Sequence, residues 1–388
     1  MIDLSQDQKD VLNTLWQWHK DENKKQFITL GGYAGTGKTT LISIFRKFLH
    51  DKHPKLKIAF CSYTGKATRV LKTKIIESEA LFPKDSISTI HALIYSPMVN
   101  SDEEIIGWEQ KDELEYDLII VDEASMIDER IWKDLLSYKV PIIAVGDHGQ
   151  LPPISGAFNL VEKPMLKLEQ IHRQAAENPI IKLSVDARTT GKIAFGDYGR
   201  NVKKISKNDP DAQEFINEIL GRYNKDTLVL CGYNFTRVKL NKFIRSALGF
   251  ETDLPEAKDR VICLRNNHKK EIYNGMLGTI KSITQDENET YYASIQMDEE
   301  DIKFKGLVST DQFNNPESLN FTSNRKKSID IDLFDFGYAT TVHKAQGSQA
   351  KRVILFEERF SKMDDEMWTR WLYTAVTRAE EELIIIGN

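Results

Sequence analysis

The chain has 388 residues, enough for two or three domains that each bury a hydrophobic core. Its composition, 40% hydrophobic and 29% charged, is that of a soluble protein, and it contains no apolar run of the roughly 18 residues that a membrane span requires. We therefore expect a cytosolic, cytoplasmic protein with no membrane partner. The net charge of −5 argues against a passive nucleic-acid coating protein, but not against a motor that releases its track in every cycle.

A phosphate-binding loop is the first predicted element that carries chemistry. A β-prone run at residues 27–30 leads into Gly32-Tyr33-Ala34-Gly35-Thr36-Gly37-Lys38-Thr39, which fits the pattern G-x-x-x-x-G-K-[ST], and a helical pattern follows over 40–49. In such a loop the backbone N–H groups surround a triphosphate, Lys38 reaches the outer phosphates and the Thr39 hydroxyl ligates magnesium. A chance match to the four fixed positions arises on the order of once in a hundred chains of this length.

Two acidic residues follow the next strongly apolar run. Residues 117–121 are predicted to form a buried strand, and Asp122 and Glu123 come directly after it. Acids at the carboxyl end of a parallel strand face the crevice where ligands bind. Asp122 would hold magnesium through water, and Glu123 would orient or deprotonate the water that attacks the γ-phosphate. The alternative is an acidic pair that only favours the start of a helix.

A third strand, at 141–145, is followed by Gly146-Asp147-His148-Gly149-Gln150. Gln150 has the reach to hydrogen-bond a γ-phosphate or its attacking water. Further along, Arg173 and Arg378 lie in two well separated segments, which indicates a site between domains. Paired arginines are expected to stabilise a transition state that spreads charge over phosphate oxygens, although a lone arginine is more often a solvated surface residue.

The three cysteines are far apart in the sequence and lack the C-x-x-C spacing of zinc sites. Cys61, Cys231 and Cys263 are therefore predicted to be core thiols. A helical stripe of Met363, Met367, Trp368, Trp371, Leu372 and Ala375 is predicted to be core that positions Arg378. The lysine pairs at 24–25, 203–204 and 326–327 are predicted to lie at the solvated surface.

The order of these motifs resembles that of superfamily 1 DNA helicases, in particular the RecD-like branch and its small phage members of the Dda type. The resemblance covers nearly the whole chain. Besides the motifs above, its residues are Gln8, the block Thr341-Val342-His343-Lys344-Ala345-Gln346-Gly347, and the run from Tyr373 to Arg378. The block at 341–347 is especially specific, because neither core packing nor nucleotide binding in general requires that string.

The resemblance implies that ATP and Mg²⁺ are the cofactors, with Thr39 and Asp122 as metal ligands. It further implies that Gln8 contacts the adenine edge and that Arg173 and Arg378 both reach the γ-phosphate. The implied nucleotide contacts are Gln8, Gly32, Gly35, Thr36, Gly37, Lys38, Thr39, Thr40 and Gly347. Two positions depart from the family pattern: Tyr33 stands where relatives often have proline, and Gln349 stands where many have an acid.

Contacts to a DNA strand are implied for both motor domains. In the first domain they are Tyr63, Thr64, Gly65, Lys66 and, in Ser88-Thr89-Ile90-His91, His91. In the second they are Thr341, His343 and Lys344, with Asn234 and Asn241 as weaker candidates. A lone histidine such as His91 is more often a structural one.

The strand and helix pattern predicts an α/β fold with two RecA-like domains, each a parallel sheet with helices on both faces. The first domain would span residues 1–175, with strands near 27–31, 57–63, 118–122, 141–146 and 166–170. The second would span residues 176–388, with strands near 227–232, 336–341, 351–357 and 382–386. ATP would sit between the two sheets, with Arg378 opposite the phosphate-binding loop.

Two insertions interrupt this pattern. Residues 92–116 are predicted to form a β-hairpin, the pin that splits the duplex in relatives, with Trp108 as its wedge. The alternative for Trp108 is that it packs the hairpin onto the domain. Residues 251–335 contain several strand-like runs separated by turn signals, which indicates a small SH3-like β-barrel; the alternative is an inert decoration.

The sequence thus predicts an ATP- and magnesium-dependent helicase that moves along single-stranded DNA from 5′ to 3′, acts on forked or tailed duplexes and works as a monomer. Replication or recombination proteins are candidate partners. Two alternatives remain open: a P-loop ATPase that remodels protein, and a single-strand-binding module with a relic ATPase fold. The intact set of Lys38, Asp122, Glu123, Arg173 and Arg378 argues against the relic.

Overall fold

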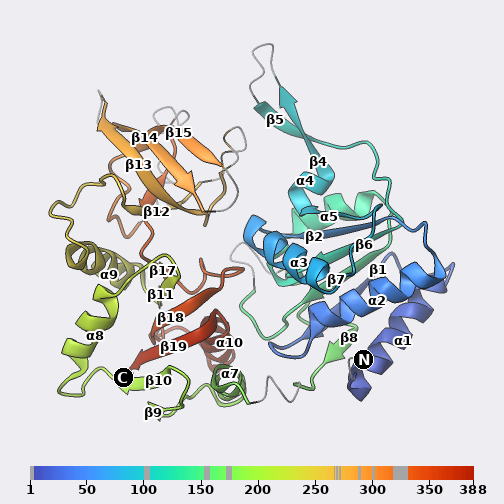
Figure 1. Ribbon diagram of the computed structural model, residues 1–388, viewed down its shortest axis with the longest axis horizontal. Coiled ribbons are helices and arrows are strands. Elements are labelled where there is room, and N and C mark those ends of the chain that lie inside the picture. Colours follow the sequence, from blue (N-terminus) through green and yellow to red (C-terminus); the bar gives the residue numbers. More distant parts are fainter. Residues whose placement is uncertain are drawn as a thin grey trace.

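The computed structural model (Figure 1) describes residues 4–99, 105–152, 158–171, 177–265, 267, 270, 272–286, 290–298, 302–317 and 331–388. It contains two six-stranded sheets, one five-stranded sheet and one two-stranded hairpin. We call the part built on the first six-stranded sheet, from α1 to β8, the first domain. The part from α7 to β19 is the second domain.

The sheet of the first domain is entirely parallel, in the order β3-β2-β6-β7-β1-β8. Its strands are β1 (Phe27–Gly32), β2 (Ile58–Ser62), β3 (Ser86–Thr89), β6 (Leu118–Asp122), β7 (Ile142–Gly146) and β8 (Leu166–Leu168). Since all strands run the same way, the carboxyl ends of β1, β6 and β7 meet at one edge of the sheet. The phosphate-binding loop, the acidic pair and the loop after β7 therefore lie together.

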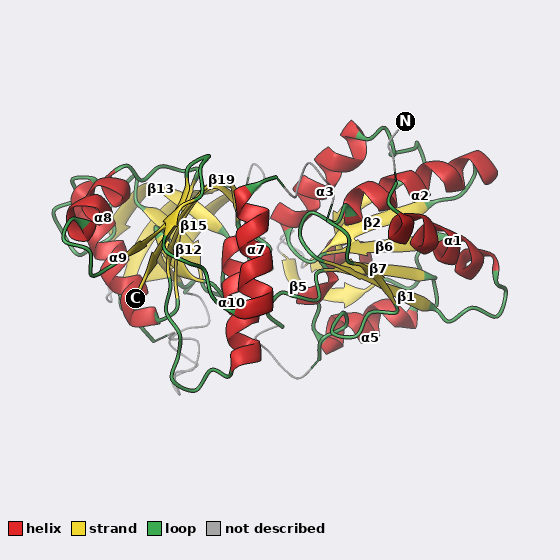
Figure 2. Cartoon of the chain, turned by 90° about the horizontal axis from the view of Figure 1, so that it is seen from below, coloured by secondary structure: helices red, strands yellow, loops and turns green. Residues whose placement is uncertain are grey.

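Helices cover both faces of this sheet because its strands are apolar on both sides. The helices are α1 (Gln6–Lys20), α2 (Lys38–Lys52), α3 (Gly65–Glu77), α4 (Ile90–Ile94) and α5 (Glu129–Ser137), with a short 3₁₀ turn at Ala124–Met126. In β6, Leu118 and Ile120 pack against α1, α2 and α3, whereas Ile119 and Val121 pack against α4 and α5. Figure 2 shows α2 and α3 on one side of this sheet and α5 on the other.

The sheet of the second domain has the order β17-β11-β18-β19-β10-β9, parallel except for β9. Its strands are β9 (Gly196–Asp197), β10 (Val202–Ser206), β11 (Thr227–Cys231), β17 (Ala339–Thr341), β18 (Ala350–Phe356) and β19 (Ala379–Gly387). The helices are α7 (Pro179–Thr190), α8 (Ala212–Gly221), α9 (Asn234–Ala247) and α10 (Asp365–Val376).

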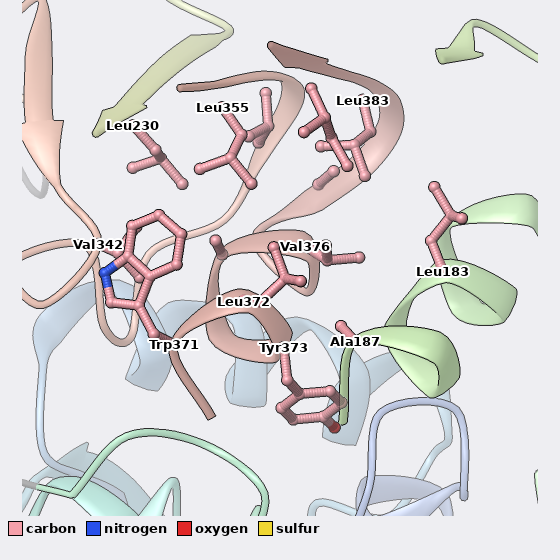
Figure 3. Close-up of a cluster of buried hydrophobic side chains, with 14 of the residues drawn as sticks. Leu183, Ala187, Leu230, Val342, Leu355, Trp371, Leu372, Tyr373, Val376 and Leu383 are labelled. Atoms are coloured by element: carbon pink, nitrogen blue, oxygen red, sulfur yellow. The ribbon is translucent and has the colours of Figure 1, made fainter. Parts of the chain in front are cut away.

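Helices α7 and α10 share one face of this second sheet, and α8 and α9 take the other. Four residues of the predicted stripe are buried in the cluster between α10, α7 and the sheet, and two pack against it partly buried: Trp368, Trp371, Leu372 and Ala375, with Met363 and Met367. Figure 3 shows Trp371 and Leu372 in this cluster. The indole rings of Trp368 and Trp371 stack with their centroids 5.3 Å apart. This packing fixes the helix that leads into Arg378.

Two β elements project from the parallel sheets (Figure 1). In the first domain, β4 (Tyr95–Val99) and β5 (Ile105–Gln110) pair as an antiparallel hairpin. In the second, β15 (Lys303–Ser309), β14 (Thr290–Met297), β13 (Leu277–Gln285), β12 (Arg260–Cys263) and β16 (Phe334–Phe336) form, in that order, an antiparallel sheet with its own core.

The main strands of both parallel sheets lie where the sequence predicted them, but β3, β9 and β10 were missed. The prediction that Lys203 and Lys204 lie at the solvated surface is wrong for Lys204, which is 6% exposed in β10 and forms an ion pair with Glu357. All three cysteines are buried and free, as predicted. Within the described ranges, no helix has both the length and the apolar character needed to cross a bilayer.

Candidate active site

The phosphate-binding loop runs from the end of β1 into α2. Gly35 and Gly37 have φ angles of +80° and +78°, which side chains other than glycine rarely adopt. Lys38 Nζ donates to the carbonyl oxygens of Gly32 (2.6 Å) and Tyr33 (3.1 Å). The ammonium group of Lys38 is thus held within the loop, next to the N-terminus of α2.

Gln8 lies directly behind this loop and is 1% exposed. Its Nε2 donates to the Thr36 carbonyl (3.1 Å), and its Oε1 accepts from the backbone N–H of Ser5 (3.2 Å). The structure therefore places the predicted adenine-contacting residue against the phosphate-binding loop, where it braces both the loop and the start of α1.

Asp122 and Glu123 lie at the end of β6, beside Lys38. Glu123 has a φ angle of +54°, so the chain turns sharply after the strand. Burial raises the pKa of both carboxyls, and for Glu123 the negative charge of Asp122 raises the pKa further. The positive charges of Arg378 and Lys38 oppose this rise at Glu123, so Arg378 of the second domain acts electrostatically on a carboxyl of the first.

The loop after β7 carries Gln150 and is bound by the second domain. The backbone N–H of Leu151 donates to Thr374 Oγ1 (2.9 Å), and the Leu151 carbonyl accepts from Gln346 Nε2 (2.6 Å). Arg370 also donates to the carbonyls of His148 (3.2 Å) and Gln150 (3.4 Å). The loop therefore connects the nucleotide edge of the first sheet to α10.

Arg378 is buried where α10 gives way to β19. Its guanidinium donates to the carbonyls of Thr374 (3.0 Å) and Ser348 (3.1 Å) and to Thr377 Oγ1 (3.2 Å). Burial lowers its pKa, and the charge of Glu123 opposes that effect. Arg173, the other predicted arginine, lies outside the described residues.

The predicted DNA contacts of the first domain lie around the start of α3 and α4. Thr64 caps α3 by accepting the N–H of Ala67 (3.2 Å), and Gly65 is the first residue of that helix. Tyr63 is 37% exposed. Lys66 Nζ donates to the carbonyl of Gln349 in the second domain (2.6 Å), so this side chain spans the two domains.

The predicted contacts of the second domain lie at the end of β17 and after it. Thr341 ends that strand, and burial lowers the pKa of both His343 and Lys344. Gly347 has a φ angle of +72°, and a Cβ there would lie 2.8 Å from Met126 Sδ of the first domain. This glycine permits a close approach of the two domains.

The two asparagines on α9 serve the local structure. Asn234 Oδ1 accepts from Arg237 Nε (3.2 Å). Asn241 is 1% exposed; its Nδ2 donates to the Phe336 carbonyl (3.2 Å) and its Oδ1 accepts the N–H of Ala339 (2.7 Å). Because both polar groups of Asn241 bind buried backbone, its geometry argues against the predicted strand contact.

Residues 18–156 match the model of an AAA domain, and residues 336–386 match that of a UvrD-like helicase C-terminal domain. The chain is 28% identical over 414 residues to the ATP-dependent RecD2 DNA helicase of Deinococcus radiodurans, an alignment that covers 99% of this chain and 49% of that protein. It is 29% identical over 281 residues to the ATP-dependent DNA helicase dda of Enterobacteria phage T4, covering 65% of this chain and 58% of that protein. The chain thus spans about half the length of these relatives.

The crystal structure of the Pif1 helicase from Bacteroides in complex with ADP-AlF3 and ssDNA superposes with a TM-score of 0.51 at 20% identity, covering 99% of this chain and 92% of that one. That likeness extends the shared fold over both domains. By these family models and relatives, the chain is similar to the superfamily 1 helicases of the RecD-like type.

Trp108 lies on β5 opposite Pro97 of β4, on the part of the hairpin nearest the domain. Its side chain packs against the core around α4 and α5, and its ring meets that of His91 edge-on at a centroid distance of 4.6 Å. The hairpin segment 100–104 lies outside the described residues. This placement favours the packing alternative for Trp108.

His91 thus lies in an aromatic cluster that extends to the second domain, because the ring centroids of His91 and Tyr273 are 6.3 Å apart.

Magnesium is compatible with the two side chains predicted to hold it. Thr39 is the second residue of α2, and Asp122 ends β6 at the same sheet edge. Across the described ranges, no cluster of three or more His, Cys, Asp and Glu side chains could hold a metal. A hydroxyl and one carboxylate suit an ion that keeps waters and phosphate oxygens as its other ligands.

Tyr373, which the sequence analysis left without a role, lies at the candidate active site. The side chain is fully buried on α10, yet its hydroxyl contacts the first domain. A buried tyrosine hydroxyl requires a hydrogen-bond partner, and the predicted burial of this helix could have indicated that Tyr373 has one. The sequence could not indicate which residues would provide that partner.

Proposed function

We propose that this chain is an ATP- and magnesium-dependent DNA helicase that translocates on single-stranded DNA from 5′ to 3′. The proposal is based on the observation that residues of both domains lie together at the predicted nucleotide site, the edge of the first sheet where β1, β6 and β7 end. Lys38 and Glu123 come from the first domain, Arg378 comes from the second, and the charge of Arg378 acts on Glu123. Because the ATP site needs both domains, ATP binding and hydrolysis can change the positions of the two domains relative to each other.

The proposed division of labour follows the geometry. Lys38 and the backbone of Gly32 to Thr40 bind the phosphates, and Thr39 with Asp122 holds Mg²⁺, which neutralises charge on the phosphate oxygens. Glu123 and Gln150 orient the attacking water. Arg378 and Arg173 stabilise the charge that develops on the γ-phosphate, Gln8 contacts the adenine, and Gly347 lies at the domain contact.

We propose two RecA-like motor domains, 1–175 and 176–388, with a pin hairpin at 92–116 and an SH3-like barrel at 251–335. The proposed strand path crosses Tyr63 to Lys66 and His91 in the first domain, and Asn234, Thr341, His343 and Lys344 in the second. The 5′-to-3′ polarity rests on the hairpin and the β-rich insertion, which resemble those of the 5′-to-3′ enzymes. Because one chain contains both halves of the ATP site, a monomer in the cytoplasm would suffice for activity.

ATP hydrolysis with and without single-stranded DNA tests the proposal first. We expect strong stimulation by the strand. Hydrolysis that ignores polynucleotide would favour a protein-remodelling ATPase, and strand binding without hydrolysis would favour a binding module with a relic ATPase fold.

Unwinding of duplexes with either a 5′ or a 3′ single-stranded tail tests the polarity. We expect the 5′-tailed duplex to be unwound, and preference for the 3′ tail would overturn the assignment. A blunt duplex is the matched control, because it offers no strand on which to load.

A further inference from the structure

The Tyr373 hydroxyl joins the second domain to the phosphate-binding loop of the first. It donates to Asp147 Oδ2 (2.6 Å) at the end of β7, and it accepts the backbone N–H of Ala34 (2.7 Å) within the loop. In Figure 3 the Tyr373 ring points from α10 away from Leu355 and Leu383 of the second sheet. The side chain thus belongs to the core of one domain while its polar end serves the other.

The directions of these two hydrogen bonds are fixed by chemistry. A phenol donates one proton and accepts through its lone pairs, whereas a carboxylate only accepts and a backbone N–H only donates. The Ala34 N–H therefore donates to the tyrosine oxygen, and the tyrosine O–H donates to Asp147. Burial, followed by the charge of Asp147, raises the pKa of Tyr373, so the hydroxyl keeps its proton near neutral pH.

The Ala34 N–H belongs to the same rigid peptide unit as the Tyr33 carbonyl. That carbonyl accepts from Lys38 Nζ (3.1 Å) and from Thr36 Oγ1 (2.8 Å). Since a peptide unit is planar, holding its N–H sets the direction of its C=O. A hydroxyl on the second domain therefore fixes the plane that holds the ammonium group of the phosphate-binding lysine.

The neighbouring side chain strengthens this connection. The Tyr33 ring meets the Tyr373 ring edge-on, with centroids 5.9 Å apart. A Cβ added to Gly149 would lie 2.8 Å from the Tyr33 ring, so little free space surrounds it. The ring contact and the hydrogen bond to Ala34 thus hold two neighbouring residues of the loop against Tyr373.

We propose that Tyr373 is a positioning residue for the phosphate-binding loop: docking of the second domain places its hydroxyl so that the Tyr33–Ala34 peptide and Lys38 are pre-organised for the triphosphate. The inference rests on the proposed function, because it makes ATP affinity depend on how the two domains are docked. Tyr373 acts through the loop and is not assigned a contact with the reacting atoms.

Tyr373→Phe tests this proposal because it removes only the hydroxyl and fills the same space. We expect the Kd of a fluorescent ATP analogue, measured without DNA, to rise about five- to tenfold, which corresponds to the loss of the one hydrogen bond that reaches the phosphate-binding loop, from the Ala34 N–H. The KM for ATP should rise by a similar factor, and kcat should fall less than threefold. Arg370→Gln is the matched control, because it removes other hydrogen bonds from α10 to the loop at 147–151 but does not reach the phosphate-binding loop.

An unchanged Kd in Tyr373→Phe, a fall in kcat with an unchanged KM, or an equal rise in Kd in Arg370→Gln would each overturn the proposal. If Tyr373→Phe fails to fold, Asp147→Asn and Asp147→Ala replace it. Asparagine keeps an acceptor for the hydroxyl and should keep the affinity, whereas alanine should lose it; equal affinities would overturn the proposal. The Kd comparison remains valid if the wild type shows no DNA-stimulated hydrolysis, which would instead count against the proposed function.

Discussion

The Arg188 guanidinium carbon lies 3.8 Å from the centroid of the Tyr33 ring. This cation–π contact joins α7 of the second domain to the phosphate-binding loop of the first. It occurs at a loop position where the family resemblance predicts proline in place of Tyr33. The departure therefore adds an interdomain contact that proline could not make.

Removing this contact should cost stability in a non-additive way. We expect Tyr33→Leu and Arg188→Gln each to destabilise the protein and to show a coupling of about 0.5–1 kcal/mol in the double variant. Denaturant unfolding of the wild type, both single variants and the double variant measures the coupling. Strict additivity would show that the two side chains are neighbours without energetic interaction.

Replacing either of two groups at the nucleotide edge should abolish hydrolysis. Lys38→Ala and Glu123→Gln should each lower DNA-stimulated kcat by at least about 100-fold, because each removes charge or water positioning at phosphoryl transfer. Burial and Asp122 raise the pKa of Glu123, so the fraction of the carboxylate form falls as the pH falls. Wild-type hydrolysis should therefore decline toward acidic pH, and undiminished turnover of Glu123→Gln would refute its role as the base.

Arg378 should act on the rate more than on binding. Arg378→Lys is preferred to Arg378→Ala, because three groups of its own domain bind the buried guanidinium and truncation would also destabilise the fold. We expect hydrolysis to fall by about 10³-fold with ATP-analogue binding nearly unchanged. Comparable losses of binding and rate in a variant with normal melting would contradict a role in the transition state.

Trp108 should behave as a packing residue. Trp108→Ala is expected to destabilise the first domain by roughly 2 kcal/mol, below the value for a fully buried aromatic, and to lower ATP hydrolysis and unwinding together. Met98→Ala is the matched control on the opposite strand, since Met98 is 38% exposed. If Trp108→Ala instead kept its stability and its DNA-stimulated ATPase while unwinding fell, the ring would be the wedge.

Stability should decline below about pH 6.5, the ordinary pKa of a histidine, because burial lowers the pKa of His19, His148 and His343 in the folded protein. A lowered folded-state pKa means that the unfolded chain takes up the proton first, so this stabilisation is present above pH 6.5 and is lost as the pH falls. Melting temperatures between pH 8 and pH 5.5 measure the effect. His343→Gln should melt with a shallower pH dependence than the wild type, and parallel curves would count against His343.

Strands with continuous apolar sequence could be predicted, and those with polar sequence could not. Leu118 to Val121 reads as a buried strand because each face of β6 packs under helices. Lys204 of β10 is buried between Glu357 and the Phe195 ring, 5.0 Å from its ammonium nitrogen. Its ion-pair partner Glu357 is far from it in the sequence, so a lysine pair in a short strand resembled a surface segment.

The nucleotide motifs were local enough to predict, whereas the contacts between domains were not. Lys38 and Glu123 belong to short patterns whose chemistry requires those residue types. Tyr373 bonds to a backbone N–H 339 positions away, and no local pattern encodes that separation. The proposed DNA contacts lie between these cases: Lys66 was selected by a motif, and its contact with Gln349 required the fold.

The buried state of all three cysteines makes the protein suited to site-specific labelling. Burial raises the pKa of each thiol and keeps it from the reactive thiolate form at neutral pH. Single cysteines introduced at exposed positions of the two domains, such as Lys9 and Glu214, would react with fluorophores while the native thiols stay unmodified. The distance between the two dyes could then be followed through each ATP cycle without removing a native cysteine.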